Sequence, residues 1–407
     1  MENLNYFIVL FALITLLILA NNRLRNSFQW RATVTPLASI IGSGFLIVAP
    51  LLHSILGKWA LAGISILLLL AYAIGAVIRF NIHYAEEHLS NQPHDNIAKL
   101  ETASQLFLGI AFAISVAFYS SLFMAFVFDQ LLITDQLLMQ SATTVLLLTI
   151  MAVAWWRGAH GLETIELIAV TIKLAIIVSV LFALGSYDLA TGKAWFEHDA
   201  IRTLSMWDTL AMLAGMLMIT QGFETARYLG ASYDKQTRTN AIRYSQWIAA
   251  GIYILFIGFT CPIFLEFPIV ELNETTISRT LGQVFFVLPI MLLIAAVASQ
   301  LSAALADTIG GGGLLKELIS VSLPDNIFYM IVIAIAIVLI WSSHIFEIIN
   351  YASKGFAIYY LLQVLIAINL IKKNITHASN FLWLGGCYFL LLILVFVIFG
   401  SIPAPHS

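Results

Sequence analysis

Residues Ile40 to Phe45, with the sequence IIGSGF, lie in the middle of an apolar run from Ala32 to Leu52. The run is long enough to cross a bilayer. Each glycine inside a helix costs about 1 kcal/mol relative to alanine. A break in the helix leaves backbone N–H and C=O groups without partners. Membranes tolerate this only where those groups are buried in protein or line a wet cavity. The stretch therefore predicts a discontinuous helix whose break presents polar backbone to a ligand.

The composition is that of an integral membrane protein. Of the 407 residues, 61% are hydrophobic and 10% are charged, whereas soluble domains carry about 25% charged residues. No connection between the apolar runs is long enough to hold a separate soluble core. Cys261 and Cys387 lie inside apolar runs, so we expect small core residues there and neither a disulfide nor a metal site.

The apolar runs predict twelve transmembrane helices. We expect them at 5–21, 32–55, 59–88, 103–132, 141–157, 163–185, 207–232, 241–265, 283–308, 326–343, 346–371 and 381–400. The four glycines at 310–313 follow one of these helices and predict a flexible turn. They lack the strand and the Lys-Ser/Thr pair of a phosphate-binding loop.

The distribution of basic residues predicts the orientation of the chain. If the N-terminus lies outside the cytoplasm, thirteen Lys and Arg residues fall on the cytoplasmic side and four on the outer side. This bias follows the positive-inside rule. We therefore expect a protein of the inner or plasma membrane with both termini on the non-cytoplasmic side.

Two halves of similar length follow the first helix. Residues 1–28 form an extra N-terminal helix and residues 372–407 an accessory C-terminal helix and tail. The core at 29–371 divides into repeats at 32–185 and 207–371, each with five helices. The first helix of the second repeat is also interrupted in mid-run, at Gly222. Paired interruptions in two halves of opposite orientation are the best sequence indication of a transporter binding site.

The chemistry of such paired breaks favours a small zwitterion. Half-helix N-termini present N–H groups and a partial positive charge that suit a carboxylate. Carbonyl groups freed at a break suit an ammonium group or a cation. An amino acid satisfies both kinds of group at once, so Gly42 and Gly222 are expected to flank its site.

Several of these residues resemble the amino acid–polyamine–organocation (APC) superfamily, which has a LeuT-type fold with a five-plus-five inverted repeat. The motif from Ile41 to Phe45 resembles the unwound first helix of that family. The Gly-Phe-Glu at 222–224 and the later Arg238 resemble its sixth helix, and Lys173 resembles a lysine of the fifth. The likeness covers about 32–371. The chain departs from the family pattern at Lys235-Gln236, where the family usually has Asn-Pro.

The resemblance implies roles for individual residues at the breaks. Backbone groups of Ser43, Gly44 and Phe45 would hold a substrate carboxylate. Carbonyl groups around Ile40, Thr220 and Gln221 would hold its amino group. Phe223 would be an aromatic lid over the site.

Lys173 lies near the centre of its helix, where a charge costs at least about 2.5 to 3.5 kcal/mol. In the family this lysine occupies the place of a bound sodium ion. The facing polar residues here are Ser299 and Ser302. Since burial lowers the pKa of a lysine, we expect Lys173 to couple transport to protons; the alternative is a permanently charged structural tether.

Three further polar residues have two interpretations each. Glu224 and Arg227 are three residues apart on one helix and form either an intrahelical ion pair or a gate. The hydroxyl of Tyr119 in mid-membrane needs a partner. It either lines the substrate cavity or joins two helices.

These observations predict a secondary active transporter of amino acids or related zwitterions. It would work by alternating access, as a proton-coupled carrier or an exchanger, without sodium. The alternatives are a carrier for an organic cation or a nucleobase, a sensory or channel-like protein on the same fold, and a membrane-embedded enzyme. We expect no enzymatic activity, no cofactor and no nucleic-acid partner.

Overall fold

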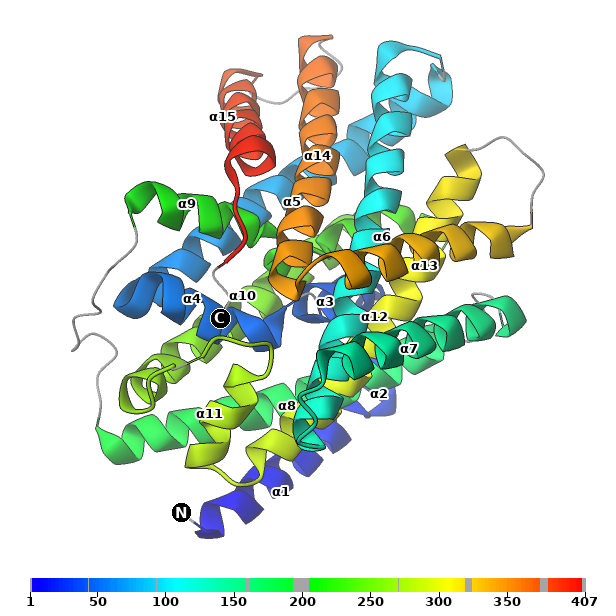
Figure 1. Cartoon of the computed structure of the whole chain (residues 1–407). Coiled ribbons are helices and arrows are strands. Elements are labelled where there is room, and N and C mark those ends of the chain that lie inside the picture. The colour runs from blue at the N-terminus through cyan, green and yellow to red at the C-terminus, as the bar shows by residue number, and fades with distance from the viewer. Residues whose placement is uncertain are drawn as a thin grey trace.

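The computed structural model describes residues 2–42, 44–92, 94–157, 162–192, 205–230, 232–269, 271–318, 324–373 and 380–404. Every secondary-structure element in these ranges is a helix (Figure 1). The α-helices are α1 (Glu2–Leu19), α2 (Asn22–Arg25), α3 (Phe28–Gly42), α4 (Phe45–Leu56), α5 (Ala60–Asn91), α6 (Asn96–Gln130), α7 (Gln136–Arg157), α8 (Leu162–Thr191), α9 (Met206–Gly215), α10 (Lys235–Glu266), α11 (Thr276–Val284), α12 (Leu288–Leu318), α13 (Asp325–Ser342), α14 (Ile345–Lys372) and α15 (Asn380–Gly400). Three short 3-10 helices are η1 (Gly57–Trp59), η3 (Leu217–Thr220) and η4 (Phe223–Tyr228).

The predicted all-helical membrane fold is confirmed. Among the described residues, seven helical stretches are long and apolar enough to cross a bilayer, and α1, α7 and α13 contain shorter apolar segments. One of the seven runs through α4, η1 and α5. Each of the twelve expected segments contains a helix, while twelve crossings and the inverted repeat stay predictions.

The discontinuous helix pair α3–α4 lies among the longest helices. α6 packs along both α12 and α14, and α3 packs along α10. α1 lies at the periphery against α8, and α15 lies at the opposite side of the molecule against α14 (Figure 1). The segments at the ends of the chain thus flank a core that contains the two interrupted helices.

The expected flexible turn at Gly310–Gly313 is wrong, because α12 continues through these glycines to Leu318. Their small size serves close packing between helices. A Cβ atom on Gly312 would lie 2.4 Å from the ring of Tyr329, and one on Gly311 would lie 3.3 Å from Phe112. In a membrane helix, a glycine run can therefore mark a contact surface where it would mark a turn in water.

Asp95 caps α6 at the side predicted to be cytoplasmic. Its carboxylate accepts hydrogen bonds from the N–H of Ala98 (2.9 Å), from Lys373 (2.8 Å) and from His88 (2.7 Å). Burial raises the pKa of Asp95, but these hydrogen bonds and the charge of Lys373 outweigh it and hold the pKa below its ordinary value. The charged carboxylate therefore ties the ends of α5, α6 and α14 together.

The segment after α15 returns toward the centre of the molecule beside α9 (Figure 1). Its Ile402 N–H donates to the carbonyl of Ala211 at 3.1 Å. The Ser401 hydroxyl donates to Asn350 at 2.8 Å. A Cβ atom on Gly215, the last residue of α9, would lie 2.5 Å from the carbonyl oxygen of Ile402. This segment therefore covers the point where α9 ends.

Candidate functional site

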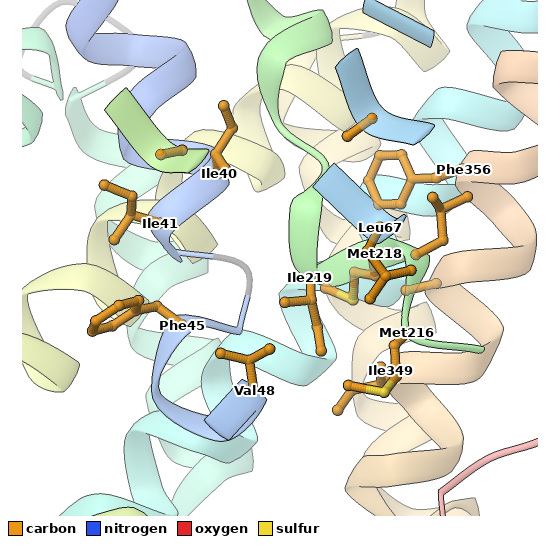
Figure 2. Close-up of a cluster of buried hydrophobic side chains, with 14 of the residues drawn as sticks. Ile40, Ile41, Phe45, Val48, Leu67, Met216, Met218, Ile219, Ile349 and Phe356 are labelled. Atoms are coloured by element: carbon orange, nitrogen blue, oxygen red, sulfur yellow. The ribbon is translucent and has the colours of Figure 1, made fainter. Parts of the chain in front are cut away.

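The first break separates α3 from α4, as predicted (Figure 2). Gly44 has a φ of 151°, a conformation that side chains rarely adopt. The carbonyl of Gly42 accepts a hydrogen bond from the Gln300 side chain at 3.2 Å. Ser43, a predicted substrate-binding residue, lies outside the described residues.

The second break separates α9 from η4, and Gly222 has a φ of 123°. Ser353 on α14 holds the start of this break, since its hydroxyl accepts from the Met218 N–H at 2.9 Å and donates to the Gly215 carbonyl at 2.7 Å. The interruption predicted at Gly222 is therefore present, and a neighbouring helix satisfies part of its backbone.

The two breaks pack directly against each other. A Cβ atom on Gly44 would lie 2.9 Å from Ile219 at the second break. A Cβ atom on Gly222 would lie 2.6 Å from the backbone nitrogen of Ile40 at the first break. Figure 2 shows Ile219 of the second break near the start of α4, which carries Phe45 and Val48. Each glycine thus makes room for the other segment.

Tyr253 on α10 joins the two breaks and was missed by sequence reasoning. Its fully buried hydroxyl lies 3.0 Å from the Ile40 carbonyl and 2.9 Å from the Ile219 carbonyl. The signal in the sequence was a tyrosine hydroxyl in mid-membrane, which needs a polar partner.

Replacing Tyr253 with phenylalanine is expected to lower the stability of the protein and its uptake of substrate. The change removes the hydroxyl shared by two buried carbonyls, and the loss of a buried hydrogen bond costs about 0.5 to 1.5 kcal/mol. Thermal unfolding and uptake into proteoliposomes measure the effect. Tyr244→Phe, at a half-exposed position of the same helix, should leave both unchanged. If the two variants had the same thermal stability and the same uptake, Tyr253 would not be a functional part of the site.

Lys173 on α8 lies beside the first break, as predicted. Its ammonium group, on a residue that is 3% exposed, donates to the Ala38 carbonyl at 2.9 Å and to Ser299 at 3.1 Å. It would lie 3.8 Å from a Cβ atom on Gly42. The other predicted partner, Ser302, donates within its own helix to the Ser299 carbonyl. A buried charge therefore contacts the backbone just before the break.

Aromatic side chains surround both breaks. Phe45 is 2% exposed and packs on Tyr253 and Phe256 of α10. Phe223 stacks on Tyr360 of α14, with 5.6 Å between ring centroids. The hydroxyl of Tyr119 on α6 lies 3.5 Å from the side-chain nitrogen of Gln221. The structure thus places Phe45, Phe223 and Tyr119, three of the predicted substrate-binding residues, at the two breaks.

Glu224 and Arg227 do not pair with each other; each contacts other helices. Glu224 accepts hydrogen bonds from the Gly222 N–H and from the Tyr360 hydroxyl, both at 2.9 Å. The Arg227 guanidinium forms a buried ion pair with Glu101 of α6 at 3.0 Å. The intrahelical pair considered from the sequence is therefore wrong.

The charge of Arg227 belongs to a buried network that sequence reasoning missed. Arg227 also donates to Gln363 of α14. Gln363 donates to Glu101 at 3.1 Å and to Ser104 at 2.9 Å, and it accepts from Asn81 of α5 at 2.8 Å. The network ties η4, which follows the second break, to α5, α6 and α14. We call Arg227, Glu101, Gln363, Ser104 and Asn81 the Arg227 network.

A second arginine fixes the connection after η4. Arg238 at the start of α10 binds both carboxylate oxygens of Glu86 on α5 at 2.7 Å and also donates to the Arg227 carbonyl. Such bidentate pairs are strong and geometrically specific. The arginine noted in the sequence therefore holds η4 against α5.

Three buried polar atoms, two of them at the breaks, have no partner among the described residues. Two of them lie at the breaks by their other contacts, namely Glu224 Oε1 and Gln300 Oε1, and the third, Ser120 Oγ, lies on α6. Buried polar atoms ordinarily have a hydrogen-bond partner, so each exception needs an explanation. A polar ligand with both donors and acceptors would satisfy them.

Comparison with known proteins gives the family. The sequence profile described as APC superfamily transporter matches residues 22–400. The chain belongs to the APC superfamily of transporters. This APC transporter is 39% identical over 367 residues to an uncharacterized protein of Aquifex aeolicus (strain VF5), and the match covers 89% of each chain.

Solved structures agree on the fold. A manganese transporter of Eremococcus coleocola is similar with a TM-score of 0.59 and 12% identity, covering 93% of this chain and 88% of that one. A sodium-coupled sialic acid symporter is similar with a TM-score of 0.52 and 12% identity, covering 99% and 98%. At this identity the likeness shows the LeuT-type fold alone. The APC transporter is therefore a multi-pass membrane protein with the fold expected from its sequence.

Proposed function

We propose that this transporter carries amino acids or related small zwitterions by alternating access, with the substrate bound between the two breaks. The observation that carries the proposal is the direct packing of two interrupted helices, each with a glycine at positive φ, in the buried centre of the protein. The core at 29–371, with repeats at 32–185 and 207–371, would supply the moving parts.

Each end of a zwitterion has candidate partners at the breaks. α4 starts at Phe45, and the N–H groups of Ile47 and Val48 already donate to the Gly44 carbonyl at 3.0 Å. The earlier N–H groups of this first turn, those of Phe45 and Leu46, have no acceptor within the helix. These groups and Gly44 would hold the carboxylate. Carbonyl groups at Ile40, Thr220 and Gln221 would hold the amino group, and the free carboxylate oxygen of Glu224 would attract it. The side-chain carboxylate of Glu224 would also attract an organic cation, which is the alternative substrate.

Uptake into proteoliposomes tests the substrate class. Purified protein should take up a labelled amino acid in a saturable way and exchange it in counterflow. Unlabelled amino acids should compete, whereas choline, uracil and Mn²⁺ should not. Competition by choline alone would indicate the organic-cation carrier, and the absence of any saturable uptake would contradict both.

Lys173 is the proposed coupling residue, with Ser299 as its partner. We expect Lys173→Gln to lower uptake by at least about tenfold, since each hydrogen bond of a charged group contributes about 1.5 to 3 kcal/mol and 1.4 kcal/mol is tenfold. The residual uptake should no longer respond to an imposed proton gradient. The exposed Lys99→Gln should retain both the rate and the response. Uptake by Lys173→Gln that matches the parent protein at every pH would leave Lys173 as a structural tether.

We also propose that the protein lies in the inner or plasma membrane with both termini outside the cytoplasm. The Arg227 network and the Arg238–Glu86 pair then lie on the cytoplasmic side, where Glu224 and Arg227 would act as parts of a gate. Accessibility of cysteines introduced at Asn5 and Lys99 to an impermeant thiol reagent would test this orientation.

A further inference from the structure

A groove of about 380 Å³ lies between α5 and α10, away from the α6, α12 and α14 side of the breaks. Its walls are almost entirely apolar and include Leu69 and Tyr72 of α5 and Trp247 and Ala250 of α10. Leu69 is 70% exposed and Trp247 is 54% exposed. Since both helices are long and apolar enough to cross a bilayer, this groove opens toward lipid. We call it the α5–α10 groove.

Two arginines lie about one to two helical turns beyond the same end of the α5–α10 groove. Arg79 follows Tyr72 by seven residues on α5, and Arg243 precedes Trp247 by four on α10. These spacings place each arginine on the helix face that lines the groove. The two positive charges are close enough to repel each other.

Arg79 is held in place without a carboxylate. Its guanidinium donates to Gln246 at 2.9 Å and lies 4.8 Å above the centre of the Tyr72 ring. Gln246 in turn donates to the Ala71 carbonyl at 2.8 Å. In the part of the chain that the structure describes, no acidic side chain pairs with Arg79 or Arg243. This end of the α5–α10 groove thus has two positive charges. That of Arg79 is held in place by its neighbours, and that of Arg243 is exposed.

An apolar groove that opens to the bilayer and ends at two unneutralised arginines matches one kind of molecule. Lipid acyl chains fill apolar grooves in the membrane, and guanidinium groups bind phosphate by paired hydrogen bonds. Basic pockets between membrane helices hold anionic headgroups on the cytoplasmic side. The arginines lie toward the end of α5 and the start of α10, which is the side predicted to be cytoplasmic.

We propose that the α5–α10 groove binds an acyl chain of an anionic phospholipid, with its phosphate held between Arg79 and Arg243. The groove is also lined by Ile40 and Thr220, one from each break. A bound chain therefore touches both discontinuous helices from the lipid side. The groove shares Ile40 and Thr220 with the proposed substrate site, but lipid binding there does not depend on the identity of the substrate.

Native mass spectrometry of the delipidated, full-length protein tests the proposal. Phosphatidylglycerol and phosphatidylcholine with identical acyl chains are added at equal concentration. The parent protein should retain phosphatidylglycerol preferentially. Arg243→Gln, at an exposed position, should reduce this preference about fivefold, the effect of about one positive charge near an anionic headgroup. The matched control Arg23→Gln, at an exposed position of α2, should retain the preference.

Two further arms separate the lipid from other ligands. Ala250→Phe fills the groove without altering the arginines and should abolish retention of phosphatidylglycerol. Free sn-glycerol 3-phosphate lacks the acyl chain and should not displace the lipid. Equal retention of both lipids by the parent protein, an unchanged preference in Arg243→Gln, unchanged retention in Ala250→Phe, or displacement by glycerol phosphate would each overturn the proposal.

Discussion

Replacing Gly222 with alanine should abolish transport and lower the thermal stability of the protein. The backbone at Gly222 has a φ of 123°, and holding a non-glycine residue in such a region costs about 1 to 3 kcal/mol. The added Cβ atom would also lie 2.6 Å from the backbone nitrogen of Ile40. A backbone atom cannot move aside as a flexible side chain does, so the two breaks would have to separate. Uptake into proteoliposomes and thermal unfolding of the purified protein measure the result.

Gly251→Ala is the matched control for this change. Gly251 lies on α10, two residues before Tyr253, and a Cβ atom there meets nothing within 4 Å. Alanine favours a helix over glycine by about 1 kcal/mol, so stability should be retained or slightly raised and uptake should be unchanged. If Gly222→Ala transported as well as Gly251→Ala, the contact between the two breaks could not be a working part of the site.

Neutralising Arg227 alone should destabilise the protein strongly. Arg227→Met leaves the buried carboxylate of Glu101 without its partner, and breaking a buried pair on one side costs about 3 to 5 kcal/mol. The double variant Arg227→Met with Glu101→Gln removes both charges and should recover a large part of this loss. Thermal unfolding of the two single variants and the double variant measures the coupling between the pair.

The proposed gate adds a second expectation for the same variants. If the Arg227 network holds the second break closed toward the cytoplasm, the double variant should be stable but should show altered uptake kinetics. The ion pair between Arg279 and Asp129 is a control on the other side of the protein, since the Arg279 side chain is 56% exposed. Although the Asp129 side chain is only 9% exposed, solvent screens the exposed guanidinium, so Arg279→Gln should cost less than Arg227→Met. Similar losses in Arg227→Met and Arg279→Gln would contradict the buried charge as the cause.

The main features of the site could be predicted because they violate local rules of membrane helices. Glycines at 42, 44 and 222 interrupt runs that would otherwise be regular, and Lys173 places a charge in a run that would otherwise be apolar. Such departures are visible without any knowledge of the fold, because hydrocarbon penalises free backbone groups and charges wherever they occur.

The partners of these residues could not be predicted, because they depend on which helices meet. Tyr253 contacts the carbonyl of Ile40 across 213 residues of sequence, and Gln363 contacts Asn81 across 282. In the sequence, Glu101 near the start of its helix looks like an ordinary solvated charge. Only packing against η4 makes it the buried partner of Arg227. The prediction of a flexible turn at glycines 310–313 was wrong for a related reason. Close helix packing and flexible turns both favour glycine, and the sequence does not show which helices meet.

The contact of Ile402 with Ala211 has a consequence for how the protein is made. The ribosome completes α9 long before the segment that covers its end. Until residues 401 and 402 emerge and enter the membrane, the carbonyl of Ala211 and the last turn of α9 lack this cover. The second break therefore reaches its final surroundings only after residues 401 and 402 have been made and have entered the membrane, and before that this end of α9 is more open to chaperones and proteases.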